Sequence, residues 1–130
     1  MYRDYAEIAR QNGKHVFMHS DGYIVDIIPD LIEVGIDALN SQVFCMRVKE
    51  LGERFRGKVT FWGENDRQHL LPRGSRQEIE QAVHEIWTCL YADGGVIAQC
   101  EFGLEAKPEN VLAVFETWNS LGLSKEKAKR

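Results

Sequence analysis

The sequence has no apolar run that approaches membrane-spanning length, and it has no excess of positive charge. Its 16 lysines and arginines are outnumbered by 20 acidic residues, which leaves a formal net charge of −4. A spanning helix needs about 20 consecutive apolar residues, and a nucleic-acid surface needs clustered basic side chains. The composition therefore argues against a membrane and against nucleic acid as partners. The first residues have no apolar signal core, so we expect a cytoplasmic protein.

Cysteine is also scarce in this chain. Cys45, Cys89 and Cys100 are an odd number, and they lack the spacing of a disulfide framework, so disulfides are not expected. Cys89 lies at helical spacing from Ile86 and is expected to be a core residue. What the chain does have is 44% hydrophobic residues over 130 positions, which is enough for one domain with a sizeable core.

Short β-forming runs alternate along the chain with amphipathic helical patterns. We expect strands over 15–18, 36–39, 58–62 and 96–98. Helices are expected over 2–12, 23–34 and 44–55, after the capping box Ser75–Glu78, and from Pro108. Pro29 either kinks the second of these helices or marks its true start. The alternation predicts parallel βαβ units with right-handed crossovers.

Each expected strand ends in a cluster of polar, chemically able residues. The clusters are His19-Ser20-Asp21, Asn40-Ser41-Gln42, Glu64-Asn65-Asp66 and Gln99-Cys100-Glu101. Polar side chains at the carboxyl ends of parallel strands are how an α/β barrel builds its active site. Such a barrel has eight βα units and this chain has four, so the sequence predicts half of a TIM barrel. We assign 1–14 to an N-terminal helix, 15–122 to the half-barrel and 123–130 to a charged tail.

An ordered series of segments carries a family resemblance. The segments are His-Ser-Asp-Gly at 19–22, Pro-Asp-Leu-Ile-Glu-Val-Gly-Ile-Asp-Ala-Leu-Asn at 29–40, Phe-Trp-Gly-Glu-Asn-Asp-Arg-Gln-His-Leu-Leu-Pro at 61–72 and Pro-Glu-Asn-Val at 108–111. In this order, the stretch from His19 to Trp118 resembles the C-terminal part of the uroporphyrinogen decarboxylase superfamily. That superfamily includes porphyrinogen decarboxylases and zinc-dependent corrinoid and coenzyme M methyltransferases. The resemblance implies a β/α barrel whose N-terminal half is absent from this sequence.

The methyltransferase branch implies a zinc site in this chain. Where this chain has its first cluster, that branch has His-x-Cys-Gly, and a later cysteine completes its zinc site. The residues at the corresponding positions of this chain are His19, Asp21 and Cys100. A histidine, an acid and a thiolate can hold zinc with one position open, and the zinc would activate a substrate thiol for methyl transfer. The alternative is that His19 is a hydrogen-bonded strand-end histidine and Cys100 a small buried residue.

Further site residues are expected at the second and third clusters. Glu64 and Asp66 could supply acid, base or ligand groups, although a solvent-exposed acidic helix start is the alternative. Gln42 and Gln68 are expected to bind substrate, whereas Asn40 is expected to cap or close a turn.

Three interpretations of function remain open on the sequence. The first is metal-assisted methyl or one-carbon transfer, on a thiol, a methylated corrinoid or a tetrapyrrole. The second is porphyrinogen decarboxylation. Those enzymes have Asn-Leu-Asp-Pro and Gly-His-Gly at two places where this chain has Glu-Asn-Asp-Arg (64–67) and Gln-Cys-Glu (99–101). The third is a truncated half-barrel without turnover. A half-barrel leaves strand edges and an apolar interior uncovered, so we expect a homo-oligomer or a complementary half-barrel as partner.

Overall fold

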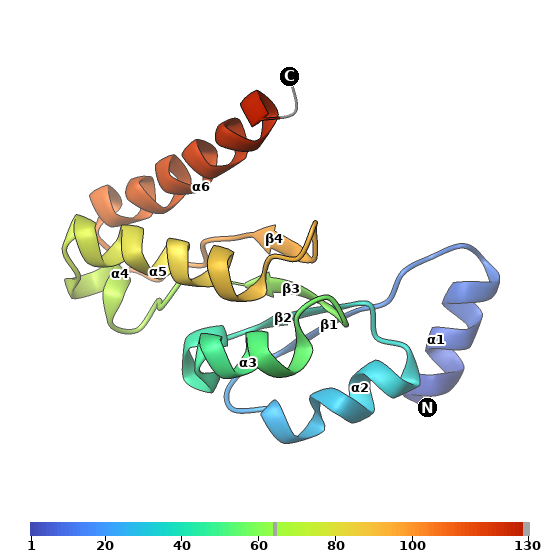
Figure 1. Cartoon of the computed structure of the whole chain (residues 1–130). Helices are drawn as coiled ribbons and strands as arrows, with labels where there is room; N and C mark the ends of the chain where they lie inside the picture. Colours follow the sequence, from blue (N-terminus) through green and yellow to red (C-terminus); the bar gives the residue numbers. More distant parts are fainter. Residues whose placement is uncertain (64, 129–130) are drawn as a thin grey trace.

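The computed structural model describes residues 1–63 and 65–128, with side chains placed as far as Gly122. It is an α/β structure with one sheet of four strands, and every neighbouring pair of strands is parallel. The order of the strands across the sheet is the same as their order along the chain, as Figure 1 shows. They are β1 (Phe17–Ser20), β2 (Ala38–Ser41), β3 (Thr60–Gly63) and β4 (Val96–Ala98). The predicted parallel α/β arrangement is confirmed.

Helices precede, separate and follow the strands. They are α1 (Tyr2–Gln11), η1 (Val25–Ile27), α2 (Ile28–Val34), η2 (Val43–Met46), α3 (Val48–Phe55), α4 (Leu70–Arg73), α5 (Arg76–Leu90) and α6 (Pro108–Ala128), where η marks a 3₁₀ helix. Over the described residues, no helix combines the length and the apolar character needed to cross a bilayer. The helix α6 extends into the segment 123–130 that was expected to be a charged tail.

Several predicted boundaries differ from the structure in an informative way. The strands expected at 15–18 and 36–39 each lie two residues later, at Phe17–Ser20 and Ala38–Ser41. Because side chains alternate with a period of two, this shift leaves the same residues on each face.

The helix expected over 44–55 is divided at Arg47, whose φ of 59° lies in the left-handed region. The helix at 23–34 begins as η1, and Pro29 stands in the first turn of α2.

The predicted capping box at the start of α5 is confirmed. The Glu78 backbone N–H donates to the Ser75 hydroxyl, and the Ser75 backbone N–H donates to the Glu78 carboxylate over 2.8 Å. These two groups satisfy donors that a helix start would otherwise leave free. The backbone N–H and the hydroxyl of Ser75 also hold the pKa of Glu78 below its ordinary value of 4.5.

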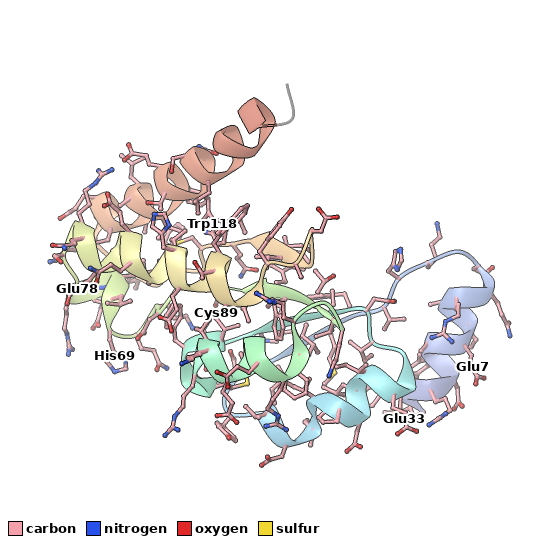
Figure 2. The ribbon with its side chains drawn as sticks, viewed as in Figure 1. Glu7, Glu33, His69, Glu78, Cys89 and Trp118 are labelled. Atoms are coloured by element: carbon pink, nitrogen blue, oxygen red, sulfur yellow. The ribbon has the colours of Figure 1, made fainter. Side chains whose placement is uncertain are left out.

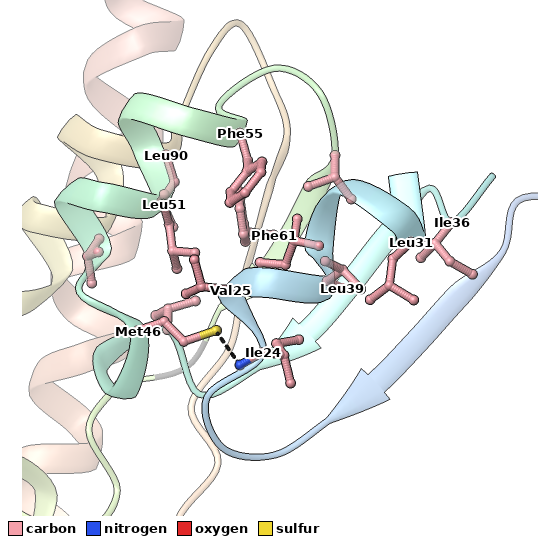
Figure 3. Close-up of a cluster of buried hydrophobic side chains, with 14 of the residues drawn as sticks. Ile24, Val25, Leu31, Ile36, Leu39, Met46, Leu51, Phe55, Phe61 and Leu90 are labelled. Atoms are coloured by element: carbon pink, nitrogen blue, oxygen red, sulfur yellow. Dashed lines mark hydrogen bonds between the residues drawn. The ribbon is translucent and has the colours of Figure 1, made fainter. Parts of the chain in front are cut away.

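The main core lies between one face of the sheet and the helices α2, α3 and α5. Leu39 and Phe61 are opposite each other in the register of β2 and β3, and both are fully buried. Around them pack Val25 and Ile28, Val43 and Met46, Leu51 and Phe55, and Ile86 and Leu90. Figure 3 shows this cluster, in which the Ile24 backbone N–H donates to the Met46 sulfur over 3.4 Å. Burial of this kind supplies most of the free energy that favours folding.

The opposite face of the sheet carries partly exposed apolar residues. Strand alternation places Phe17, Trp62 and Ile97 on this face. The Phe17 and Trp62 rings pack with their centroids 4.8 Å apart. Phe17 nevertheless remains 49% exposed, and Ile97 remains 40% exposed. We call Phe17, Trp62 and Ile97 the open-face residues.

The helices α3 and α5 approach each other closely at Gly52. A Cβ atom on Gly52 would clash with the carbonyl oxygen of Cys89, closer than real Cβ atoms come, and would lie 3.0 Å from the carbonyl carbon. Cys89, labelled on α5 in Figure 2, is half-buried and packs against the main core, as its helical spacing predicted. Burial raises the pKa of its thiol, and the nearby Glu85 carboxylate adds to the rise.

Candidate functional site

The described residues of the four polar clusters lie at one edge of the sheet. All three strand pairs are parallel, so the carboxyl ends of all four strands meet there. This is the arrangement that the strand-and-helix alternation predicted. It is also the edge at which open parallel sheets and barrels place ligands.

Asn40 connects three strand ends through its carboxamide. Its Nδ2 donates to the Trp62 carbonyl oxygen over 3.0 Å and to Gln99 Oε1 over 2.9 Å. Its Oδ1 lies 2.6 Å from Nδ1 of His19. A backbone carbonyl can only accept, so Asn40 must present its NH₂ to Trp62 and its oxygen to His19. Neutral His19 therefore carries its proton on Nδ1, and Nε2 is the atom that can take up a proton or a metal ion.

Asp21 faces this available nitrogen and also binds an arginine. Its Oδ2 lies 3.8 Å from His19 Nε2, and its Oδ1 accepts from Arg67 over 2.8 Å. Arg67 also donates to the carboxylate of Glu101, beyond β4. One guanidinium thus ties the loops after β1, β3 and β4 together.

Cys100 lies in different surroundings from His19 and Asp21. It packs against a second apolar cluster of Leu71, Ile79, Val83, Ala113 and Val114, between α4, α5 and α6. Side-chain alternation explains this, because its neighbour Gln99 turns to Asn40 on the other face. Within residues 1–63 and 65–128, no three His, Cys, Asp or Glu side chains are grouped to hold a metal ion. The three-residue zinc site remains a prediction.

Asp66 organises the loop that follows β3. Its Oδ1 accepts from the backbone N–H groups of Gln68 and His69, each over 2.9 Å, and its Oδ2 lies 3.1 Å from the His69 ring. This is a local Asp-mediated turn, and it leads into α4, where Figure 2 labels His69. Glu64, the other predicted catalytic acid, lies outside the described residues.

A small hollow of about 130 Å³ lies between the connections that follow β2 and β3. Gln42, Phe44 and Cys45 line it from one connection, and residues 65–69 line it from the other. The structure thus brings together both predicted substrate-binding residues, Gln42 and Gln68. Gln42 Oε1 accepts from the Gly22 backbone N–H over 3.1 Å, which fixes the side chain between the first two clusters.

The sequence argument missed the role of Asn40. It ended the second strand at Leu39, which made Asn40 a turn residue, whereas β2 continues through Ser41 and buries Asn40 within the sheet. A signal was present, because Asn40 follows Leu39 in an alternating strand and therefore faces the side of His19 rather than the core. His84, in contrast, is exposed on α5.

Comparison with known proteins gave no relatives. No protein-family model, no curated protein and no solved structure matches this chain.

Proposed function

We propose that this chain is the C-terminal half of a β/α barrel of the uroporphyrinogen decarboxylase type. Four parallel strands in chain order, with helices between them, are what an arc of such a barrel would contain. The open-face residues would then point into the barrel interior. A second copy of the chain, or a complementary half-barrel, would cover them.

For the chemistry, we propose metal-assisted methyl or one-carbon transfer at the carboxyl ends of the strands. The observation that carries this proposal is the orientation of His19. The Nδ1 atom of His19 donates to Asn40 Oδ1 over 2.6 Å, and the Nε2 atom of His19 faces Asp21. Metal-binding histidines commonly have this arrangement, in which the second ring nitrogen donates to a fixed acceptor.

The residues that would hold the metal are His19 and Asp21, with Cys100 as the predicted third. The first two fit, since Nε2 and Oδ2 are 3.8 Å apart on neighbouring parts of one strand end. Cys100 would have to turn away from its apolar cluster to join them. A bound zinc ion would hold a substrate thiol as the thiolate at neutral pH. Gln42 and Gln68 would position the rest of the substrate.

Porphyrinogen decarboxylation is less well supported by the charges at this edge. Its substrates carry several carboxylates, which need cations that are free to bind them. Arg67 is already paired with Asp21 and Glu101. We therefore place methyl or one-carbon transfer first.

Zinc titration by calorimetry, with metal analysis of the purified protein, tests the proposal. We expect His19→Ala to remove most of the zinc affinity, and His84→Ala, which changes an exposed histidine on α5, to leave it unchanged. Affinity should fall as the pH falls, because the ligating atoms must lose their protons. If the purified protein holds no zinc and both variants respond to zinc as wild type does, the metal proposal is wrong. Porphyrin binding would then favour the decarboxylase, and its absence would favour a half-barrel without turnover.

A further inference from the structure

The last helix of the chain, α6, is apolar on two opposite faces. On one face, Ala113 and Val114 are fully buried against α4 and α5. On the other face, Leu112 remains 56% exposed and Phe115 remains 47% exposed. A helix that is hydrophobic all round is typical of a buried position, with neighbours on every side. The second apolar face of α6 lacks such a neighbour among the residues that the structure describes.

The exposed face of α6 forms one wall of an apolar groove. The segment between β4 and α6 forms the other wall, in which Phe102 is 58% exposed and Leu104 is fully exposed. The groove has a volume of about 650 Å³, and each of its eight lining residues, all within 102–115, is apolar or glycine. We call it the α6 groove. Apolar surface gathered in this way indicates a site where another apolar surface binds.

The exposed apolar side chains of this chain are confined to its two ends. Among the side chains that the structure describes, every large apolar one that is exposed lies before residue 28 or after residue 96. The first stretch contains β1 and the last begins in β4, and these are the two strands with a free edge. The central units have a neighbour on each side and expose none. The uncovered surface therefore lies where the next βα unit would be expected.

We propose that a second copy of this chain covers the α6 groove with the segment that follows its own β1. In a two-copy barrel, β1 of one copy would lie beside β4 of the other, and parallel strands bring the segments after both to the same edge. Tyr23 is 60% exposed and lies three residues beyond β1, whereas Phe102 lies four residues beyond β4. Tyr23 of the second copy would therefore reach the groove, with its ring in apolar contact and its hydroxyl at the water.

A second copy fits this groove better than the chain's own first unit does. Figure 1 shows α1 and α2 well apart from α6, so the first unit of the same chain does not cover the groove. Each copy carries one groove and one exposed Tyr23, and a two-fold axis would satisfy both pairs with the same contact. Ile27 lies outside this contact, because a 3₁₀ helix repeats every three residues and places Ile27 in line with the buried Ile24. The proposal rests on the barrel of the proposed function and on none of its metal chemistry.

Sedimentation equilibrium of the full chain measures the dimer dissociation constant and tests this proposal. We expect Leu104→Lys and Tyr23→Lys each to raise that constant by roughly tenfold or more, because each places a charge in an apolar contact. Both side chains are exposed, so both variants should keep the far-UV circular dichroism of the wild type. Gln81→Lys adds the same charge at an exposed position on α5, in a central unit. It is the matched control and should leave the constant unchanged.

A charge pair tests the contact between the two surfaces directly. The double variant Tyr23→Lys/Leu104→Glu would place a lysine of each copy beside a glutamate of the other. It should therefore dimerise more tightly than Tyr23→Lys or Leu104→Glu alone. If the two substitutions weaken the dimer additively, Tyr23 does not bind in the α6 groove and the proposal is wrong.

Two further results would overturn the proposal. A wild-type chain that stays monomeric, or that pairs only with a protein of another sequence, would remove the second copy as the occupant. Loss of the dimer in Ile97→Lys but not in Leu104→Lys would leave the open-face residues covered and the α6 groove empty. The half-barrel would then stand, and this inference would be wrong. Zinc titration of Leu104→Lys reports on the metal proposal separately, because Leu104 is not among the predicted ligands.

Discussion

Asn40 shows how one buried amide can determine the chemistry of a neighbouring side chain. It is 9% exposed, and its three hydrogen bonds link it to residues that follow or lie in three other strands. Because the Trp62 carbonyl oxygen can only accept, the orientation of the amide is fixed, and the proton position on neutral His19 is fixed with it. A charged group in place of Asn40 would not give the same combination of donor and acceptor.

We predict that Asn40→Ala lowers the free energy of unfolding by about 2 kcal/mol, since it removes three hydrogen bonds and leaves partly buried groups of its partners without them. Urea denaturation measures the change. The ¹⁵N shifts of the His19 ring should also change from one tautomer to a mixture. Gln81→Ala, at an exposed position on α5, is the control and should stay within about 0.5 kcal/mol of wild type. Unchanged ring shifts in Asn40→Ala would contradict the assigned role.

At the scale of single residues, the sequence predicted which residues lie at the same edge of the sheet. It predicted less well which side chains there bind one another. It placed His19, Asp21 and Gln42 at one sheet edge, and the structure agrees. It gave no account of Arg67 joining Asp21 to Glu101, because those residues are 46 and 34 positions from Arg67 along the chain. Pairings over such distances depend on side-chain directions that a local pattern does not contain.

At the scale of elements, the pair α3 and α5 illustrates a packing constraint imposed by one residue. Gly52 allows the backbone of α5 at Cys89 to lie against α3 with no side chain between them. Glycine is otherwise unfavourable in a helix interior by about 1 kcal/mol relative to alanine. Its presence at this position is therefore explained by the close approach and not by helix propensity.

We predict that Gly52→Ala lowers the free energy of unfolding by about 2 kcal/mol, because the added methyl group overpacks the contact. Helix propensity alone would predict the opposite sign, so the direction of the change decides between the two effects. Thermal and urea denaturation would measure it. Glu53→Ala, on the exposed side of the same helix, serves as the control and should be nearly neutral. A more stable Gly52→Ala protein would show that the helices separate easily.

Element type was predictable from the sequence, whereas element boundaries were less so. The periodicity of 2–12 and the capping box at Ser75 identified helices that the structure contains. The break at Arg47 was not foreseen, because the apolar pattern from Phe44 to Phe55 continues through it. A residue in the left-handed region is stabilised by its tertiary surroundings and leaves no mark in hydrophobic periodicity.

At the scale of the whole molecule, the two faces of the sheet are unequal. Helices bury Leu39 and Phe61 on one face, while Phe17 and Ile97 on the other remain accessible. An apolar sheet face between two unpaired strand edges favours association. This asymmetry follows from pairing in chain order, because crossovers of one hand between consecutive strands put every connecting helix on the same face. It underlies the expectation of a partner.

We predict that the purified chain has at least twice the monomer mass in analytical ultracentrifugation. Ile97→Lys should shift it toward monomer, because a charge on the open face disfavours burial against a second copy. Ile27→Lys changes a residue that is 45% exposed on the helical side and should leave the mass unchanged. A monodisperse wild-type monomer with a well-dispersed NMR spectrum would contradict the prediction.

The strands lie in the sheet in the same order as along the chain, and this has a consequence for how the molecule folds. Strands that follow one another along the chain are neighbours in the sheet. Pairing can therefore spread from a central nucleus of β2 and β3, with each further unit adding to a surface that already exists. Every step closes only the loop between consecutive strands, and the closure cost grows slowly with length even for the longest of these loops, from Gly63 to Val96. Opening would run in reverse, with β1 and β4 exchanging their amide hydrogens before the two central strands.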